Sequence, residues 1–226
     1  MKGLIAVAHP DDETIFFAGL IQAWKHIEWT VVCATDGNWR GRGEERQNEL
    51  IAACATLKIK HIKFLGFADN PNYRLKLKLL TQELSQLPAF DYVFTHGIFG
   101  EYSHPHHQDI SYATHAVFSK KSKVFGIAYN EFPDLLVALS RKHYAVKSKI
   151  LRSTYLKETV KILHHVPTSA VEGFTRNSIA RISKIYHHIC GKKKLSTQDL
   201  DFWLAEFTRR STQLNKKSVN VSPKGL

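Results

Sequence analysis

The 226-residue chain has no long apolar run and only three cysteines. None of its apolar stretches reaches the roughly 18 residues that a membrane-spanning helix needs. Cys33, Cys54 and Cys190 are scattered and odd in number, so we expect neither a disulfide framework nor a cysteine-based zinc site. The first apolar run is short and soon followed by acidic residues, unlike a secretion signal. With 43% hydrophobic residues, the chain can build a core, which excludes a disordered protein.

Acidic residues are scarce in the second half of the chain. Residues 1–112 carry 11 Lys and Arg against 13 Asp and Glu, whereas residues 113–226 carry 21 against 7. The whole basic excess behind the net charge of +12 therefore lies in the second half. Such a surface suits a phosphate-bearing substrate, a nucleic acid or an anionic membrane face, and it is equally consistent with an ordinary solvated surface.

Short apolar runs alternate with helical patterns along the first half of the chain. The runs are apolar at successive positions, which is typical of strands that are buried on both faces of a parallel sheet. The expected strands are 3–8, 29–35, 61–65, 91–95 and 123–129, and the expected helices between them are 14–26, 44–57, 74–87 and 107–119. The pattern predicts an α/β fold with a mostly parallel sheet and helices on both faces. Three further helices are expected at 146–164, 174–189 and 197–213, which would make a helical C-terminal region.

Titratable side chains gather directly after the first and fourth expected strands. The first group is His9, Asp11, Asp12 and Glu13, and the second group is His104, His106 and His107. Ligands of an open parallel sheet bind beyond the carboxyl ends of its strands, so both groups lie where a site is expected. His9, Asp12 and one histidine of the second group can form a three-ligand metal site with an open position, as a catalytic Zn²⁺ uses.

Asp11 would then be placed to take a proton from water at this site. The structural alternative is a turn in which Asp11 or Asp12 caps a helix that starts near Glu13. The other histidines, His96 included, are interpreted as ordinary surface or core side chains.

At these residues the sequence resembles the PIG-L/LmbE family of zinc-dependent N-acetylglucosaminyl deacetylases. Residues 8–13 are similar to the family's A-H-P-D-D-E signature, and residues 104–107 are similar to its second signature, H-P-D-H. Weaker features are T-D-G at 35–37, R-x-x-E at 46–49 and E-x-F at 172–174. The resemblance runs from residue 3 to about residue 175.

The resemblance implies a Rossmann-like sheet and removal of the N-acetyl group from an N-acetylglucosamine-type aminosugar conjugate. By position, His9, Asp12 and His107 are the expected zinc ligands. Fe²⁺ also accepts two histidines and a carboxylate, so the sequence leaves Zn²⁺ and Fe²⁺ open. We expect residues 1–175 to form the deacetylase core and residues 176–226 to form a basic helical extension packed on or beside it.

The resemblance also assigns roles to residues outside the ligand set. Asp11 is the expected general base, and His104 is the expected stabiliser of the oxyanion. Tyr102 resembles a mobile tyrosine that assists His104 in some members. Arg46 and Asp69 match sugar-binding positions.

One residue departs from the family pattern. His106 stands where the family usually has an aspartate, which commonly supports His104. Asp109 is the nearby carboxylate that can substitute for it. If nothing substitutes, the chain is a degenerate member that binds an aminosugar without turnover.

The expected partner is an aminosugar conjugate, with a phosphate- or lipid-linked aglycone favoured by the basic second half. A basic nucleic-acid-binding regulator is a weaker alternative, because no established nucleic-acid motif is present, and we expect no nucleic-acid partner. Dinucleotide binding is excluded, since no G-x-G-x-x-G follows the first strand. The expected location is the cytoplasm, with peripheral contact to an anionic inner membrane surface left open. Oligomeric state is not indicated.

Overall fold

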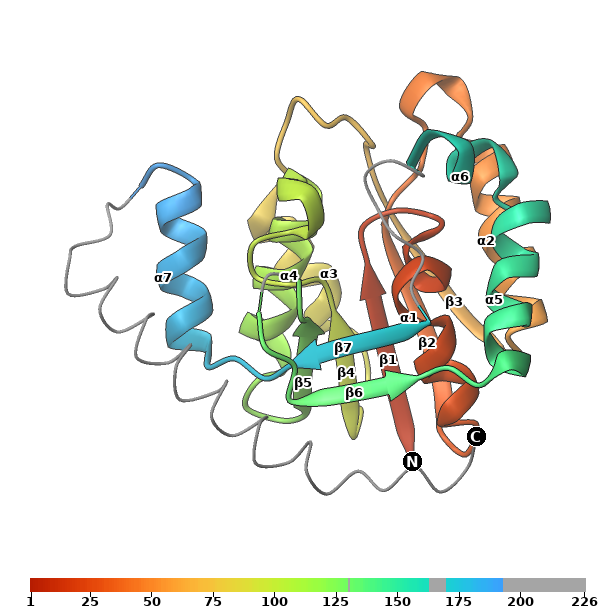
Figure 1. The fold of residues 1–226 in the computed structure, drawn as a ribbon. Helices are drawn as coiled ribbons and strands as arrows, with labels where there is room; N and C mark the ends of the chain where they lie inside the picture. Colours follow the sequence, from red (N-terminus) through yellow and green to blue (C-terminus); the bar gives the residue numbers. More distant parts are fainter. Residues whose placement is uncertain (130, 163–169, 193–226) are drawn as a thin grey trace.

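The computed structural model describes residues 1–129, 131–162 and 170–192 (Figure 1). Its strands are β1 (Lys2–Val7), β2 (Glu28–Thr35), β3 (His61–Phe67), β4 (Tyr92–Thr95), β5 (Lys123–Ile127), β6 (Leu135–Ala138) and β7 (Val171–Thr175). Its helices are α1 (Asp12–Ala23), α2 (Gly43–Thr56), α3 (Leu77–Ser85), α4 (Pro105–Phe118), α5 (Arg141–Ser153), α6 (Leu156–Ile162) and α7 (Ile179–Ile189), with 3₁₀ turns η1 (Trp39–Gly41) and η2 (Glu101–Ser103). The predicted α/β fold is confirmed.

The seven strands form one sheet in the order β3-β2-β1-β4-β5-β7-β6. Strands β1 to β5 pair in parallel, whereas β7 runs antiparallel to both β5 and β6. The chain proceeds outward from β1 to β3 and then returns to the other side of β1 with β4. The strand order therefore reverses between β1 and β4, and in open α/β sheets the ligand site lies at such a switch point.

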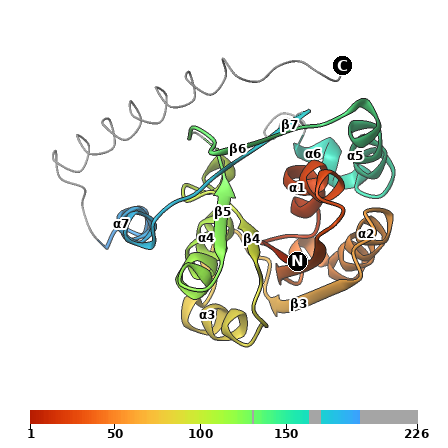
Figure 2. The ribbon, with the colours of Figure 1, turned by 90° about the horizontal axis from the view of Figure 1, so that it is seen from below.

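Strand β1 shows why the apolar runs do not alternate with polar residues. Leu4 and Ala6 contribute to one hydrophobic core, and Ile5 and Val7 contribute to another on the opposite face. Helices α1, α2 and α5 cover one face of the sheet, whereas α3 and α4 cover the other, with α7 outside α4 (Figure 2). Both faces of β1 are therefore buried, and the cluster at its carboxyl end is held from both sides.

The second half of the chain departs from the prediction. The expected single helix 174–189 is wrong, because Phe174 lies in β7 and α7 begins only at Ile179. The Ser178 side chain caps α7 by accepting a hydrogen bond from the Arg181 amide. The expected helix 146–164 is two helices, α5 and α6, and β6 was not predicted. Short antiparallel edge strands carry a weak local signal, since distant pairing stabilises them.

Two other expectations concern the C-terminal part. The predicted helix 197–213 lies outside the described residues, and the division into a core of residues 1–175 and an extension of residues 176–226 stays a prediction. Within the described ranges, no helix is long and apolar enough to cross a membrane.

The carboxylate of Glu172 joins three elements in the core. Its two oxygens accept hydrogen bonds from the Gly19 and Leu20 amides of α1, each at 2.8 Å. The Lys147 ammonium of α5, wholly buried, donates to the same carboxylate at 2.7 Å. A side chain at position 19 would place its Cβ 2.9 Å from the Glu172 carboxyl carbon, so this approach requires glycine. Glu172 thus ties β7 to both helices.

We expect Glu172→Gln to lower the free energy of unfolding by about 3 kcal/mol, because it removes the carboxylate charge that lies 2.7 Å from the buried Lys147 ammonium. Denaturant unfolding measures the change. A second substitution, Lys147→Met, in the Glu172→Gln background should recover part of the loss. An unchanged unfolding midpoint in the single variant would show that the ion pair does not stabilise the core.

Candidate metal centre and active site

The two predicted groups of titratable residues meet at the switch point of the sheet. His9 follows β1, Asp12 begins α1, and His107 lies in the first turn of α4 beyond β4. One donor atom from each of these three residues lies within 4.8 Å of the others, and all three side chains are buried. The expected ligand set is therefore brought together by the pairing of β1 with β4.

The spacing of the donor atoms matches a small cation. Nδ1 of His9 lies 3.1 Å from Nε2 of His107 and 3.5 Å from Oδ2 of Asp12. Nε2 of His107 lies 3.6 Å from Oδ1 of Asp12. In a tetrahedral zinc site with bonds of about 2.0–2.1 Å, neighbouring donors lie about 3.3 Å apart. The two nitrogens are therefore spaced like neighbouring donors of such a site, and each lies at a similar distance from one of the two Asp12 oxygens.

The rings of His9 and His107 carry their protons on the nitrogens that point away from the cluster. Their unprotonated nitrogens therefore face one another. The Glu101 carboxylate accepts a hydrogen bond from Nδ1–H of His107 at 2.7 Å, so Nε2 of His107 carries no proton and faces the cluster. Asp69 lies 3.4 Å from Nε2 of His9, and a proton there leaves Nδ1 bare toward Asp12. Two bare nitrogens beside a carboxylate, all buried, repel each other and attract a cation. The residues present therefore fit a divalent metal ion.

The pKa values of the two ligand histidines shift in opposite directions. Burial alone would lower the pKa of His9, but Asp12 and Asp69 outweigh it and raise the pKa to about 9. Burial and the nearby His96 lower the pKa of His107 to about 4. In the protein alone, an extra proton on His9 can thus bridge the 3.1 Å gap to His107. A metal ion would displace that proton, so its binding weakens as pH falls.

Asp11 does not act as a helix cap. It occupies the N-cap position of α1 with a φ of 123°, yet its side chain makes no capping hydrogen bond. Oδ2 of Asp11 instead faces Nη2 of Arg46 at 3.4 Å, and the Asp11 amide donates to Glu13 at 3.1 Å. Burial raises the pKa of Asp11, and Arg46 acts against this rise. Asp11 thus occupies the N-cap position without capping α1 through its side chain, and its carboxylate remains available for chemistry.

His104 presents one particular ring nitrogen to the site. Its Nδ1 accepts a hydrogen bond from the His106 amide at 3.2 Å, which caps α4. Burial and the neighbouring His9 lower the pKa of His104 to about 2, so the ring is neutral. The single proton of the neutral ring is therefore on Nε2, which can donate a hydrogen bond.

Tyr102 lies beside the same cluster. Its hydroxyl is 3.5 Å from Nε2 of His107, and the side chain is 38% exposed. Its φ of 46° places it in the left-handed region, directly after Gly100 and Glu101 in the chain. Such a conformation costs of order 1–3 kcal/mol for a non-glycine residue. The strained turn brings a phenol to the open edge of the cluster.

Sequence reasoning missed two buried residues, His96 and Glu101. His96 lies between two carboxylates, within hydrogen-bond distance of Glu101 and 3.2 Å from Asp12. Burial would lower the pKa of His96, but these carboxylates raise it to about 10. Glu101 also accepts the Gly97 amide at 2.9 Å. The available signal was the position of both residues in the loop that follows β4.

Three other residues named from the sequence, Arg46, Asp69 and Asp109, form ion pairs in the structure. Arg46 binds Asp69 at 2.8 Å, so the two expected sugar-binding residues are paired with each other. Asp109 does not replace the missing aspartate beside His104. Its carboxylate accepts hydrogen bonds from Arg74 and the Tyr186 hydroxyl, each at 2.6 Å, and from the amide of Leu75.

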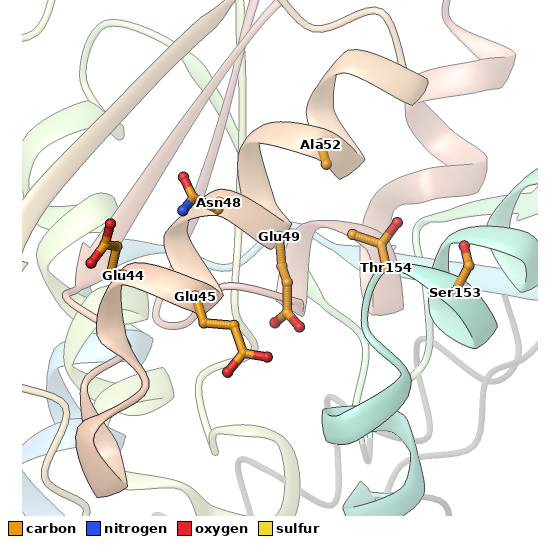
Figure 3. A pocket seen from close by; sticks show the side chains of 7 residues that line it. All are labelled: Glu44, Glu45, Asn48, Glu49, Ala52, Ser153 and Thr154. Atoms are coloured by element: carbon orange, nitrogen blue, oxygen red, sulfur yellow. The ribbon is translucent and has the colours of Figure 1, made fainter.

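The described residues also line hollows outside the ligand cluster. One of about 750 Å³ lies between α2 and the turn after α5 (Figure 3). Its lining includes Glu44, Glu45 and Glu49, so its charge disfavours a phosphate-bearing ligand. Another of about 550 Å³ is lined mainly by apolar side chains and includes Asn70 and Tyr73. The carbonyls of those two residues contact His106, which places the second hollow next to the cluster.

The fold and the cluster define a Rossmann-like α/β protein with a His/His/Asp group at its switch point that could hold a metal ion. Comparison with known proteins makes the identification more specific. The PIG-L family, described as GlcNAc-PI de-N-acetylase, matches residues 4–118. The chain therefore belongs to the PIG-L family, which confirms the resemblance inferred from its signatures.

Individual relatives show how far the similarity extends. A probable N-acetylglucosaminyl-phosphatidylinositol de-N-acetylase of Dictyostelium discoideum is 33% identical over 132 residues, 54% of this chain and 51% of that protein. This chain thus spans about half the length of that relative. N,N'-diacetylchitobiose deacetylase of Pyrococcus horikoshii shares the fold, with a TM-score of 0.53, 19% identity, and coverage of 79% of this chain and 84% of that chain. The zinc-inhibited form of a teicoplanin deacetylase has a TM-score of 0.55 at 15% identity, covering 72% and 86%.

We expect Glu101→Gln to weaken Zn²⁺ binding about 10–100-fold, because the single, uncharged amide oxygen of Gln cannot accept from Nδ1 of His107, Nδ1 of His96 and the Gly97 amide together as the Glu101 carboxylate does. Competition with a chromophoric chelator measures the affinity. Glu28→Gln is the control, because Glu28 is exposed at the start of β2, away from the cluster, and its substitution should leave zinc affinity unchanged. Equal affinities for the Glu101→Gln variant and the unaltered chain would contradict the ligand-orienting role of Glu101.

Proposed function

We propose that this PIG-L protein removes the N-acetyl group from an N-acetylglucosamine-type conjugate in a metal-dependent hydrolysis. The observation that carries the proposal is the convergence of His9, Asp12 and His107 at the switch point, with Asp11 and His104 beside them. The family supports an aminosugar as the substrate. Zn²⁺ fits the donor set, and Fe²⁺ is the alternative ion.

The reaction needs a base that removes a proton from water and later returns it to the amine. A divalent cation in the ligand set would supply Lewis acidity to the water and to the acetamide oxygen. Asp11 has no capping bond to break, and Arg46 orients its carboxylate from 3.4 Å. It takes the proton of the attacking water and delivers it to the leaving nitrogen, so that acetate and a free amine are formed.

The developing oxyanion needs hydrogen-bond donors. Because the amide of His106 occupies Nδ1 of His104, Nε2 of His104 carries the proton and can donate it toward an oxyanion. His104 thereby acts as a neutral donor, and no carboxylate is required at position 106 to charge it. Tyr102 offers a second hydroxyl donor at the open edge of the cluster. Each such donor contributes about 10²–10³-fold to rate.

The substrate class is proposed from charge and shape. The Dictyostelium relative is named for a phosphatidylinositol-linked aminosugar, and the Pyrococcus structure for a chitobiose. In this chain α5 exposes Arg141, Lys142, Lys149 and Arg152, which favours a phosphate-bearing conjugate over a neutral glycan. The apolar hollow beside Asn70 and Tyr73 is a candidate place for the aglycone, and Arg46 and Asp69 are candidates to hold the sugar.

Location and membrane contact are part of the same proposal. A cytoplasmic protein that touches an anionic membrane surface would meet a lipid-linked aminosugar there. No nucleic-acid partner is proposed.

We expect Asp11→Ala to keep the bound metal and to lower kcat by at least about 10²-fold, since it removes the general base. His9→Ala should lose the metal itself. Acetate release from a panel of N-acetylglucosamine conjugates, run together with metal analysis, separates the two effects. Full turnover in the Asp11→Ala variant would exclude the mechanism. A metal-loaded, unaltered chain that binds the panel but releases no acetate would support the degenerate alternative.

Raising the salt concentration should increase KM for a phosphate-bearing conjugate, because salt screens the attraction to the basic surface. KM for an uncharged N-acetylglucosamine glycoside, measured in parallel, should change little. A KM for the phosphate-bearing conjugate that stays constant between low and high salt would show that the basic surface does not attract the substrate.

A further inference from the structure

His106, the residue that departs from the family signature, contacts a ligand histidine. Its side chain is 1% exposed, and its Nδ1 lies 3.1 Å from Nε2 of His9. Its backbone amide, not its ring nitrogen, donates to Nδ1 of His104, and the two rings meet edge to face with their centroids 5.1 Å apart. The ring of His106 is therefore connected to the proposed metal centre through its contact with His9.

Two backbone carbonyls determine where the proton of His106 lies. Nε2 of His106 is 3.1 Å from the carbonyl oxygen of Asn70 and 3.0 Å from that of Tyr73. Carbonyl oxygens only accept hydrogen bonds, so Nε2 must carry a proton. A neutral imidazole has one such proton, and Nδ1 of His106 is therefore an acceptor.

The same reasoning fixes the position of the proton on the ring of His9. Nδ1 of His106 accepts, so Nε2 of His9 donates across the 3.1 Å contact. Nδ1 of His9 is then bare, and this is the nitrogen that faces His107 and Asp12. Asp69, 3.4 Å from the same Nε2, favours the same tautomer from a longer distance.

We propose that His106 is a positioning residue that keeps Nδ1 of His9 free for a divalent cation, with its own tautomer set by the carbonyls of Asn70 and Tyr73. The inference rests on the proposed metal centre. It links the 70–73 segment, which lines the apolar hollow, to the ligand set through two hydrogen-bonded rings. A loop on the proposed substrate side and a metal ligand are thereby coupled.

Two matched substitutions test separately the two hydrogen-bonding functions of His106, which are to accept from His9 and to donate to the backbone carbonyls. The Asn side chain of His106→Asn places its carbonyl oxygen near the position of Nδ1, so it still accepts from His9 but no longer reaches both carbonyls. The longer side chain of His106→Gln reaches the Nε2 position and donates to the carbonyls, but it offers His9 no acceptor at the Nδ1 position. Both variants keep a neutral polar side chain.

Zinc affinity of the full chain, measured by chelator competition without substrate, is the first readout. We expect His106→Gln to lose about 10–100-fold in affinity and His106→Asn to remain within about threefold of the unaltered chain. The second readout is the ¹⁵N spectrum of the imidazole rings in the zinc-loaded, unaltered chain. It should show His9 with a protonated Nε2 and a metal-bound Nδ1, and this measurement does not depend on whether a variant folds.

Three outcomes would overturn the proposal. These are zinc bound through Nε2 of His9, equal losses of affinity in the Asn and Gln variants, and unchanged affinity in the Gln variant. In the last case Asp69 alone sets the tautomer. A chain that binds no zinc overturns the proposal together with the metal centre. A chain that binds zinc as expected but releases no acetate overturns only the proposed function.

Discussion

The site depends on one electrostatic constraint, the burial of two bare imidazole nitrogens and a carboxylate within 3.6 Å of each other. Such a set is unstable alone and is completed by a proton or a metal ion. The neighbours of His9 and His107 keep the ring protons on the outer nitrogens. Glu101 does this for His107, and Asp69 and His106 do it for His9. Groups outside the three candidate ligands thus leave the nitrogens that face the cluster free for the proposed metal ion.

The fold supplies that arrangement through the reversal of strand order between β1 and β4. Because the two strands are neighbours, loops that are nearly 100 residues apart in sequence end at the same edge of the sheet. Burial of β1 on both faces prevents the His9 end from shifting. On the far side of α1, the Lys147–Glu172 pair ties that helix to α5 and β7, so the helix that carries Asp12 is anchored along its length.

Local patterns predicted the parallel half of the fold well, because those strands are apolar in themselves and the helices between them have a clear period. They failed for β6 and β7. The residues around Phe174 look like the start of the helix that contains Ile179, and only pairing of β7 with β5 and β6 makes them a strand. A strand stabilised by distant partners leaves little trace in its own sequence.

The sequence by itself determined the family, the parallel core and the ligand candidates. The position of His9 and Asp12 after a strand is a local property, and the resemblance to the family signature singled out His107 among the histidines of the second group. Only the tertiary structure decided which groups surround those ligands. His96 and Glu101 are ordinary in sequence, yet burial beside Asp12 and His107 makes them part of the centre. The direction of His106 toward His9, and of Asp109 toward Arg74, likewise follows from packing of α4 against distant segments. Which nitrogen of a ring carries its proton depends on neighbours in space, and spacing along the chain does not encode them.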